Sequence, residues 1–295
     1  MEISDCDILT VIIPVHRVFN NFQDLKLSML LAHESECAIK FILVQDGDDD
    51  FTKKELLKLS ELYGAEYVNV SVSSPGLARN AGLERVKTKW VAFWDSDDFG
   101  HAVNSIDAIQ SAPVNCMAIV GGYEVRTAFS YKTLLTNKPC GNLPKLMLNP
   151  GLWRFIFRTD FIGDLRFKDL EMGEDQVFLC ELCLEEETVY RADTLLYVYH
   201  KEVPGQLTSK ESALRDLVLA ITELLKLTEV KKYNLPYIQL VRLKLILTAL
   251  KGKQIKISNL LLLIAHISKS PTRSIYSLLA SFFRFGFYIA LGKFK

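Results

Sequence analysis

The chain has 295 residues, of which 49% are hydrophobic and 24% charged, so it can bury a sizeable core. Six cysteines in this length exclude the dense disulfide framework of a small secreted protein. The formal net charge is zero, but residues 230–295 hold twelve Lys or Arg and no Asp or Glu, which leaves 23 basic and 35 acidic residues before them. Because this basic tail is also rich in Leu, Ile and Phe, a membrane surface is favoured over nucleic acid as its partner.

The first seven residues, MEISDCD, are acidic and lead straight into a predicted strand, so we expect a cytoplasmic protein without a signal peptide. Cys180 and Cys183 form a CxxC pair within a segment of helical spacing. No second pair or nearby His completes a zinc site, so we interpret both as ordinary core cysteines.

The first half of the chain alternates segments typical of strands with segments typical of helices. The predicted strands are 9–15, 39–44 (ended by a turn at 45–47), 66–70, 90–94 and 117–121, and the predicted helices are 21–33, 53–63, 77–86 and 102–111. Such alternation predicts βαβ units and a mainly parallel sheet.

The second half is less regular. Residues 132–151 are predicted to form a long loop over the expected ligand site, because Pro, Gly and Asn interrupt the alternation of strands and helices. The further predicted elements are a helix at 174–184, a strand at 194–199 and helices at 214–227 and 238–250. The apolar segment 275–291 is interrupted by Arg284 and Gly286 and is short for a spanning helix, so we expect it to lie at a membrane interface.

Residues 90–100 read WVAFWDSDDFG, an apolar run that ends in the carboxylates of Asp95, Asp97 and Asp98. The run suits a buried strand of a parallel sheet, and ligands of such sheets bind beyond the carboxyl ends of the strands. Crowded carboxylates repel one another unless a cation lies among them, and hard divalent cations prefer oxygen ligands. The segment therefore indicates a metal-dependent site for an anionic ligand. The simpler alternative is a solvated acidic turn.

Two further segments carry candidate functional groups. GLARNAG at 76–82 opens a predicted helix with small residues that allow close backbone approach, and its Arg79 offers a guanidinium to phosphate or carboxylate. Glu174 and Asp175 begin a later helix, where the helix dipole alone would stabilise carboxylates. Each segment is unspecific by itself.

In this order the motifs resemble those of the family-2 glycosyltransferases of the GT-A fold. The matching segments, between roughly residues 8 and 210, are TVIIPVHR at 10–17, VQDGD at 44–48, GLARNAG at 76–82, FWDSDD at 93–98, LRFKD at 165–169, GEDQVF at 173–178 and LLYVYH at 195–200. The resemblance implies an α/β fold with a Rossmann-like, mainly parallel GT-A sheet flanked by helices and a C-terminal helical extension. Residues 1–210 would form the catalytic domain, with the nucleotide-sugar half at about 1–121 and the acceptor half at about 122–210, and residues 211–295 the basic, apolar extension.

The resemblance also implies a role for each matching residue. Mg²⁺ or Mn²⁺ would bridge the donor diphosphate, with Asp97 as main ligand, Asp95 facing the ribose and Asp98 supporting the metal or the sugar. Asp175 would be the general base that deprotonates the acceptor hydroxyl, assisted by Glu174, which gives a single displacement with inversion. His200 would either cap the metal or be structural. The donor-binding residues would be Pro14, His16, Gln45, Asp46, Arg79, Asn80, Asp95 and Ser96.

Two departures from the family pattern affect the expected substrate. The family usually has two consecutive Asp before the Gly of the second-strand turn, and the first contacts the nucleobase; here that position is Gln45. A carboxamide can accept a hydrogen bond from uracil but can also donate one, so a UDP-sugar is expected less firmly than the diphosphate. The Gln-x-x-Arg-Trp motif of processive synthases is replaced by Gln206-Leu207-Thr208, which favours transfer of one sugar per binding event.

The leading hypothesis is therefore a hexosyl- or N-acetylhexosaminyl-transferase that acts on a glycan or lipid-linked acceptor in lipopolysaccharide, capsule or other surface polysaccharide synthesis. Its basic tail would place it peripherally on the inner face of the plasma membrane, although the same tail could pack on the catalytic domain. The alternatives are a sugar nucleotidyltransferase and a non-catalytic GT-A-like binding subunit. The first would carry a Gly-rich, Arg-containing loop after the first strand, where this chain has Pro14-Val15-His16-Arg17.

Overall fold

The computed structural model describes residues 8–18, 22–127, 131–132, 143–147, 151–201 and 212–229, and also residues 237, 238, 240–242, 244 and 245. The predicted segment 275–291, Gln206-Leu207-Thr208 and most of the predicted loop 132–151 lie outside these residues. The chain divides into two compact units. The first comprises Met1–Cys140, Gly151–Asp169 and Leu184–Gln206, and the second comprises Gly141–Pro150, Leu170–Cys183 and Leu207–Lys295.

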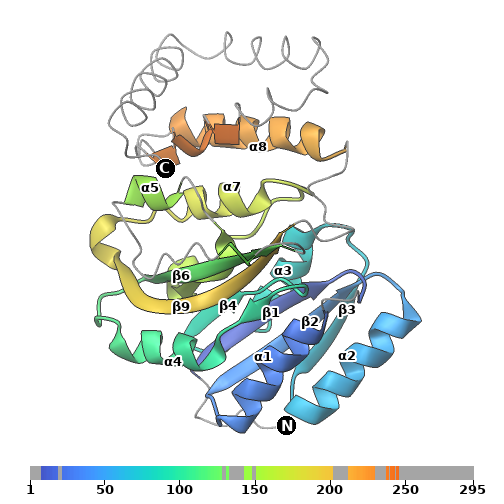
Figure 1. The fold of residues 1–295 in the computed structure, drawn as a ribbon. Coiled ribbons are helices and arrows are strands. Elements are labelled where there is room, and N and C mark those ends of the chain that lie inside the picture. Colours follow the sequence, from blue (N-terminus) through green and yellow to red (C-terminus); the bar gives the residue numbers. More distant parts are fainter. Residues whose placement is uncertain are drawn as a thin grey trace. The chain divides into compact units, whose positions relative to one another are not determined.

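The first unit begins with the predicted βαβ pattern (Figure 1). Its parallel strands are β1 (Leu9–Val15), β2 (Ile39–Asp46), β3 (Glu66–Val70) and β4 (Trp90–Phe93), and the helices that alternate with them are α1 (Phe22–Glu34), α2 (Asp50–Tyr63), α3 (Pro75–Leu83) and α4 (Ala102–Ser111). β1 lies between β2 and β4, with Val15 opposite Gln45 and Ile12 opposite Phe93. The parallel half of the sheet is therefore confirmed.

The rest of the sheet mixes directions. It contains β5 (Phe99–Gly100), β6 (Ala118–Thr127), β7 (Tyr131–Lys132), β8 (Phe155–Arg158) and β9 (Val189–Lys201). Among the described strands the order is β3-β2-β1-β4-β8-β6-β9-β5, with β7 beside β6. β8 is antiparallel to both β4 and β6, whereas β6 and β9 are parallel. β5, β7 and β8 were not expected from the sequence.

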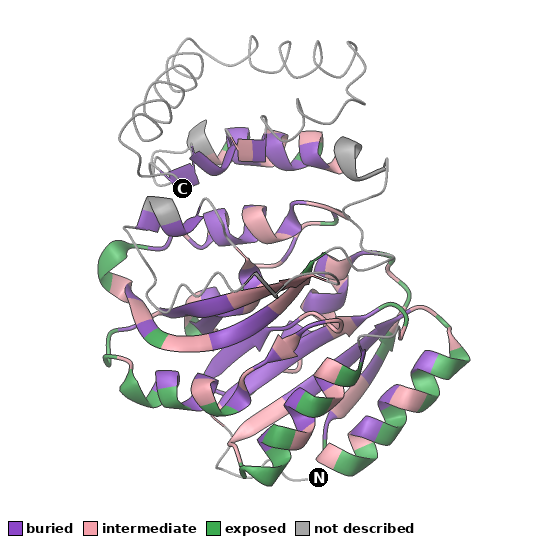
Figure 2. Cartoon of the chain, in the orientation of Figure 1, coloured by how far each residue is buried: buried purple, intermediate pink, exposed green. Residues whose placement is uncertain are grey.

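Helices cover both faces of the parallel strands. On one face, apolar residues of α1, α2 and α4 form a single core with alternate strand residues such as Val11, Ile13 and Leu43. On the other face α3 packs closely, because a Cβ on Gly82 would lie 2.5 Å from Cγ2 of Ile12. Figure 2 shows buried strands and exposed outer surfaces of α1 and α2. β1, β4 and most of β2 are buried on both faces, which explains why these strands are continuous apolar runs in the sequence.

Some element boundaries differ from the prediction. β2 continues through Gln45 and Asp46, where a turn was expected, because both residues still pair with β3. α2 begins three residues early, since Asp49 caps it by accepting a hydrogen bond from Thr52 N at 2.7 Å. α3 begins at Pro75 behind the cap Ser74 and ends at Leu83 instead of residue 86. β9 spans thirteen residues instead of the predicted six.

The remaining short elements of the first unit are η1 (Leu152–Arg154), α6 (Thr159–Ile162) and η2 (Glu186–Thr188). The second unit contains α5 (Leu143–Met147), α7 (Glu174–Glu181) and α8 (Ser212–Glu229). α7 packs against α8, whose buried residues include Leu217, Ala220, Ile221 and Leu224. Within the described ranges, we find no helix with the length and apolar character needed to cross a membrane.

Candidate functional site

The site lies at the edge of the sheet where β1, β2 and β4 end, because parallel strands bring their carboxyl ends together. Pro14 is the penultimate residue of β1, and His16 follows the strand with its side chain exposed. Gln45 and Asp46 end β2, and Asp95 is the second residue after β4. The structure thus brings together five of the predicted donor-binding residues.

Asp46 anchors the loop that leads into α3. Its Oδ1 accepts hydrogen bonds from Val72 N at 2.8 Å and Ser73 N at 3.0 Å, and its Oδ2 accepts one from Ser74 N at 3.1 Å. His16 Nδ1 donates to the Asp46 carbonyl at 2.9 Å. Asp46 therefore connects the ends of β1 and β2 with the start of the GLARNAG helix.

Gln45 is fully buried, and both ends of its amide already have partners. Its Oε1 accepts from the Tyr67 hydroxyl at 2.6 Å, and its Nε2 donates to the Asp49 carbonyl at 2.9 Å. Asp49 is the cap of α2. Gln45 thus ties β2 to β3 and to the start of α2, a structural role that its place in the family motif did not suggest.

Arg79 lies beneath the predicted metal site. It is 7% exposed, its Nη2 donates to Asp95 Oδ1 at 2.9 Å, and its guanidinium lies 5.6 Å from the centre of the Phe167 ring. The neighbouring Asn80 exchanges two hydrogen bonds with the Phe167 backbone, at 2.9 and 2.8 Å. Phe167 belongs to the LRFKD segment, so the structure joins two of the sequence motifs directly.

Residues 95–98 form a turn at the end of β4, here called the DSDD turn. Asp95 N donates to the Tyr197 hydroxyl at 2.8 Å, and Tyr197 is fully buried. The Tyr197 ring stacks on Trp153 with ring centres 4.7 Å apart. Ser96 and Asp97 are half-buried in the same turn. The position of Asp95 is therefore set by Arg79 at its carboxylate and by Tyr197 at its backbone.

Asp98 differs from the other two carboxylates because it is 2% exposed. Its Oδ1 accepts from His200 N at 2.7 Å and lies 3.5 Å from His200 Nδ1. Burial raises the pKa of Asp98 to about 7, the charges of Asp97 and Asp95 act in the same direction, and the hydrogen bond from His200 opposes them. The Asp98 carboxylate in turn raises the pKa of His200. Burial and the neighbouring carboxylates therefore both disfavour the charged form of Asp98.

The Asp98 side chain provides a test of whether a cation fits here. Its Oδ2 is buried and has no hydrogen-bond partner among the residues that the structure describes, which is costly for a carboxylate oxygen. A hard cation would be a partner for this oxygen and would relieve the repulsion among the three carboxylates. In the described part of the chain, however, no three His, Cys, Asp or Glu side chains already converge as a complete ligand set. The residues fit a cation that completes its coordination with other oxygens, such as those of a diphosphate.

The predicted base lies in the second unit, at the start of α7. α7 begins at Glu174, as predicted, and both Glu174 and Asp175 are in its first turn. Glu174 is 7% exposed, while Asp175 is half-buried and its Oδ1 accepts from Gln176 N at 2.8 Å. Gly173 precedes them with φ of +87°, and a Cβ there would lie 2.9 Å from the Ala220 Cβ of α8. Gly173 is required both by its backbone conformation and by the close approach of α8.

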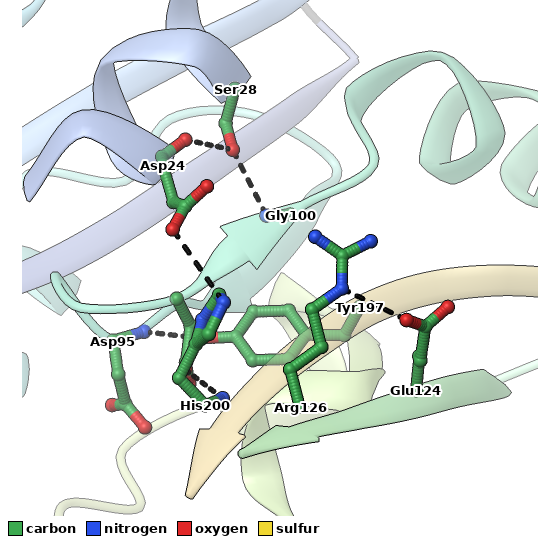
Figure 3. Close-up of polar contacts among 9 residues, drawn as sticks. Asp24, Ser28, Asp95, Gly100, Glu124, Arg126, Tyr197 and His200 are labelled. Carbon is green, nitrogen blue, oxygen red and sulfur yellow. Dashed lines mark hydrogen bonds and ion pairs between the residues drawn. The ribbon is translucent and has the colours of Figure 1, made fainter. Parts of the chain in front are cut away.

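Sequence reasoning did not find several residues that support the turn. Tyr197 holds Asp95, Phe167 lies against Arg79, and Asp24 of α1 lies 3.6 Å from His200 (Figure 3). Tyr197 and Phe167 stood in segments that matched the family, but their roles depend on contacts between residues far apart in the chain. Asp24 stood in a helix whose sequence carries no motif.

Comparisons with known proteins bear on this geometry. Residues 10–102 match the family model described as Glycosyl transferase family 2, a range that contains β1 to β4 and the DSDD turn. No curated protein sequence matches the chain significantly.

Solved structures share the fold. S. aureus TarS 1–349 superposes with a TM-score of 0.65 at 16% identity, over 90% of this chain and 82% of that one. Its complex with UDP-GlcNAc gives 0.64 at 16% identity, over 92% and 81%. The mannosyltransferase PcManGT from Pyrobaculum calidifontis, in complex with GDP-Man and Mn²⁺, gives 0.52 at 14% identity, over 92% and 85%. The family match covers the strands that build the site, and the similar solved structures share the GT-A fold with this chain.

Proposed function

We propose that the protein transfers one sugar from a nucleotide-sugar donor, a UDP-sugar, to a glycan or lipid-linked acceptor by a metal-dependent inverting displacement. The observation that carries the proposal is the DSDD turn at the carboxyl edge of the parallel strands, with a buried Asp98 oxygen that has no hydrogen-bond partner in the described part of the chain. The complexes of similar structures with UDP-GlcNAc and with GDP-Man and Mn²⁺ support a nucleotide-sugar donor and a divalent cation.

Asp97 is the proposed main ligand of Mg²⁺ or Mn²⁺, with Asp98 and Asp95 beside it. When bound, the cation would neutralise the charge that develops on the leaving diphosphate. Arg79 adds a permanent positive charge under the same turn, since a guanidinium stays protonated at any physiological pH. Both ring nitrogens of His200 face carboxylates, so we assign this residue to holding Asp98 and not to the metal.

The proposed reaction is one displacement at the anomeric carbon. The acceptor hydroxyl oxygen forms the new bond to that carbon, the bond to the diphosphate oxygen breaks, and the hydroxyl proton passes to Asp175. Attack from the face opposite the leaving group inverts the anomeric configuration. Glu174, buried beside Asp175, is proposed to contact the acceptor or to orient the base.

Composition supports the proposed place of action. Residues 230–295 contain twelve basic and no acidic residues, and each basic residue near an anionic membrane contributes roughly 1 kcal/mol to binding. We propose that this tail associates with the inner face of the plasma membrane, where a lipid-linked acceptor would be found. Liposome flotation of the full chain and of a version ending at Lys269 tests this, and equal flotation of both would contradict it.

The central test is donor hydrolysis across a panel of UDP-sugars with Mn²⁺, in the presence and absence of candidate acceptors. Asp97→Ala should abolish hydrolysis and transfer. Asp175→Asn should abolish transfer while UDP still binds, because the base acts only on the acceptor. Asp107→Asn, an exposed carboxylate on α4, is the matched control and should behave as the wild type. Unchanged hydrolysis in Asp97→Ala would remove the proposed metal role.

A further inference from the structure

The first helix makes two contacts beside the DSDD turn, one with Gly100 and one with His200 (Figure 3). Asp24 and Ser28 lie one turn apart on α1, and the Ser28 hydroxyl donates to the Asp24 carbonyl at 2.9 Å. The same hydroxyl accepts from Gly100 N at 3.0 Å, and Ser28 is fully buried. Gly100 follows the turn by two residues, so this bond holds the chain where it leaves the turn.

The second contact runs through His200. Asp24 Oδ2 lies 3.6 Å from His200 Nε2, and His200 Nδ1 lies 3.5 Å from Asp98 Oδ1. The imidazole thus lies between one carboxylate from α1 and one from the turn, at the end of β9. Its side chain is only 16% exposed, so water screens these interactions less than on an open surface.

The space around the turn leaves little freedom for movement. A Cβ on Gly100 would lie 2.4 Å from the Trp94 ring, so the backbone after the turn presses against the residue before it. Arg126 also lies near His200, and its Nε is 2.8 Å from Oε1 of Glu124. Asp24 and Asp98 each direct a carboxylate oxygen at a ring nitrogen of the imidazole, at 3.6 and 3.5 Å.

We propose that Asp24 is a positioning residue, which holds the imidazole of His200 against Asp98 and so keeps the DSDD turn in the geometry that binds the donor diphosphate. This inference rests on the proposed function. Asp24 itself faces the imidazole and not the turn, so it acts through His200. Partners that orient the residues around a metal site typically change its affinity by 10- to 100-fold when removed.

The simpler alternative is an ordinary ion pair at the surface, since the Asp24 side chain is 31% exposed. Such pairs contribute little to stability and nothing to ligand binding. The two possibilities differ in what Asp24→Asn changes. Substituting a positioning residue alters the affinity for the nucleotide and metal, and this change in affinity requires His200. Substituting one member of a surface pair leaves the affinity unchanged.

The experiment uses the full chain with UDP and Mn²⁺ as probes, and calorimetry measures the affinity. We expect Asp24→Asn to weaken UDP binding in the presence of Mn²⁺ by about 10-fold, Asp24→Glu to restore most of it, and Glu34→Gln, at the exposed far end of α1, to bind as the wild type. His200→Gln should weaken binding similarly, and adding Asp24→Asn to it should have no further effect. The proposal would be overturned if Asp24→Asn kept the wild-type affinity. It would also be overturned if the fold-losses of affinity in the two single variants multiplied in the double variant.

A second measurement separates this inference from the proposed function. If the wild type binds no UDP with Mn²⁺, the proposed donor is contradicted, and the thermal midpoints of the wild type, Asp24→Asn, His200→Gln and the double variant then decide about Asp24. If the midpoint shift of the double variant is smaller than the sum of the two single shifts, Asp24 and His200 are coupled and the contact through His200 is retained. A double-variant shift equal to that sum would show that Asp24 and His200 act independently and would overturn the proposal.

Discussion

Asn80 and Phe167 exchange two hydrogen bonds across 87 positions of the sequence: Asn80 Nδ2 donates to the Phe167 carbonyl at 2.9 Å, and Phe167 N donates to Asn80 Oδ1 at 2.8 Å. The Asn80 amide thus pairs with both backbone polar groups of Phe167, as the backbone of an adjacent strand would. It fixes the Phe167 ring beside Arg79, whose guanidinium also contacts Asp95. The GLARNAG motif therefore supports the site through the LRFKD segment as well as through its own Arg.

Removing this pair should cost stability and donor affinity together. Asn80→Ala leaves a part-buried N–H and a part-buried carbonyl without these partners, which costs about 1–3 kcal/mol for each such group. Asn80→Asp keeps an acceptor for Phe167 N but loses the donor, so it should fall between Ala and the wild type. Urea unfolding and UDP binding measure the two effects.

The matched control is Asn104→Ala, which removes one hydrogen bond, from Asn104 Nδ2 to the Leu195 carbonyl at 2.7 Å. It should lower the free energy of unfolding less than Asn80→Ala and leave UDP affinity unchanged. Equal losses in both variants would mean that Asn80 is only one hydrogen-bonding residue among many.

Asp98→Asn should separate folding from binding. Burial already raises the pKa of Asp98 to about 7, so a neutral amide of the same shape suits its surroundings. Its Oδ1 can still accept from His200 N. We expect an unfolding midpoint at or above that of the wild type and weaker Mn²⁺-dependent UDP binding. Tighter nucleotide binding in this variant would show that the carboxylate does not serve the cation.

Gln45 leads to a prediction that runs against its place in the motif. The amide is fully buried and both of its ends are hydrogen-bonded, to Tyr67 and to Asp49, so we expect it not to contact a nucleobase. Gln45→Leu should lower the unfolding midpoint, because the Tyr67 hydroxyl and the Asp49 carbonyl each lose a partner. The ratio of affinities for UDP and GDP should stay the same. A changed ratio would indicate that Gln45 contacts the nucleobase.

These residues show where reasoning from sequence succeeds and where it ends. β1 and α4 have the predicted bounds because β1 is an apolar run buried on both faces and the apolar residues of α4 repeat every three to four positions against the core. β3 also has its predicted bounds. β8 has only four residues and is inserted between β4 and β6, and such non-local pairing leaves no local pattern. The motif order predicted the fold and a set of residues that the structure brings together at the carboxyl edge of the parallel strands. The motifs did not distinguish residues whose polar groups face the ligand from residues, such as Gln45 and Asn80, whose polar groups are used inside the protein.

The buried thiol of Cys180 leads to a prediction about the pH dependence of the free energy of unfolding. Burial raises the pKa of the Cys180 thiol well above its usual range, and Cys180 is fully buried. The folded state therefore keeps its proton at a pH where the unfolded thiol, with a pKa of about 8.5, ionises. This contribution to stability is complete below the unfolded pKa and is lost as the pH rises toward the folded one. Urea unfolding at neutral and alkaline pH should show a smaller alkaline loss in Cys180→Ala than in the wild type, and identical losses would contradict this.

Gly173 tests how precisely the proposed base must be held. Alanine there would adopt a left-handed conformation, which costs about 1–2 kcal/mol, and its Cβ would also meet Ala220 Cβ at 2.9 Å. Gly163→Ala is the matched control, because its φ is also positive, +52°, but its Cβ would meet only the Asp160 carbonyl, at an ordinary 3.8 Å. If α8 sets the start of α7, Gly173→Ala should lower the transfer rate more than the affinity for UDP, since Glu174 and Asp175 follow directly. Gly163→Ala should lower stability alone. Loss of UDP affinity in Gly173→Ala with an unchanged rate would place these carboxylates at the donor instead of the acceptor.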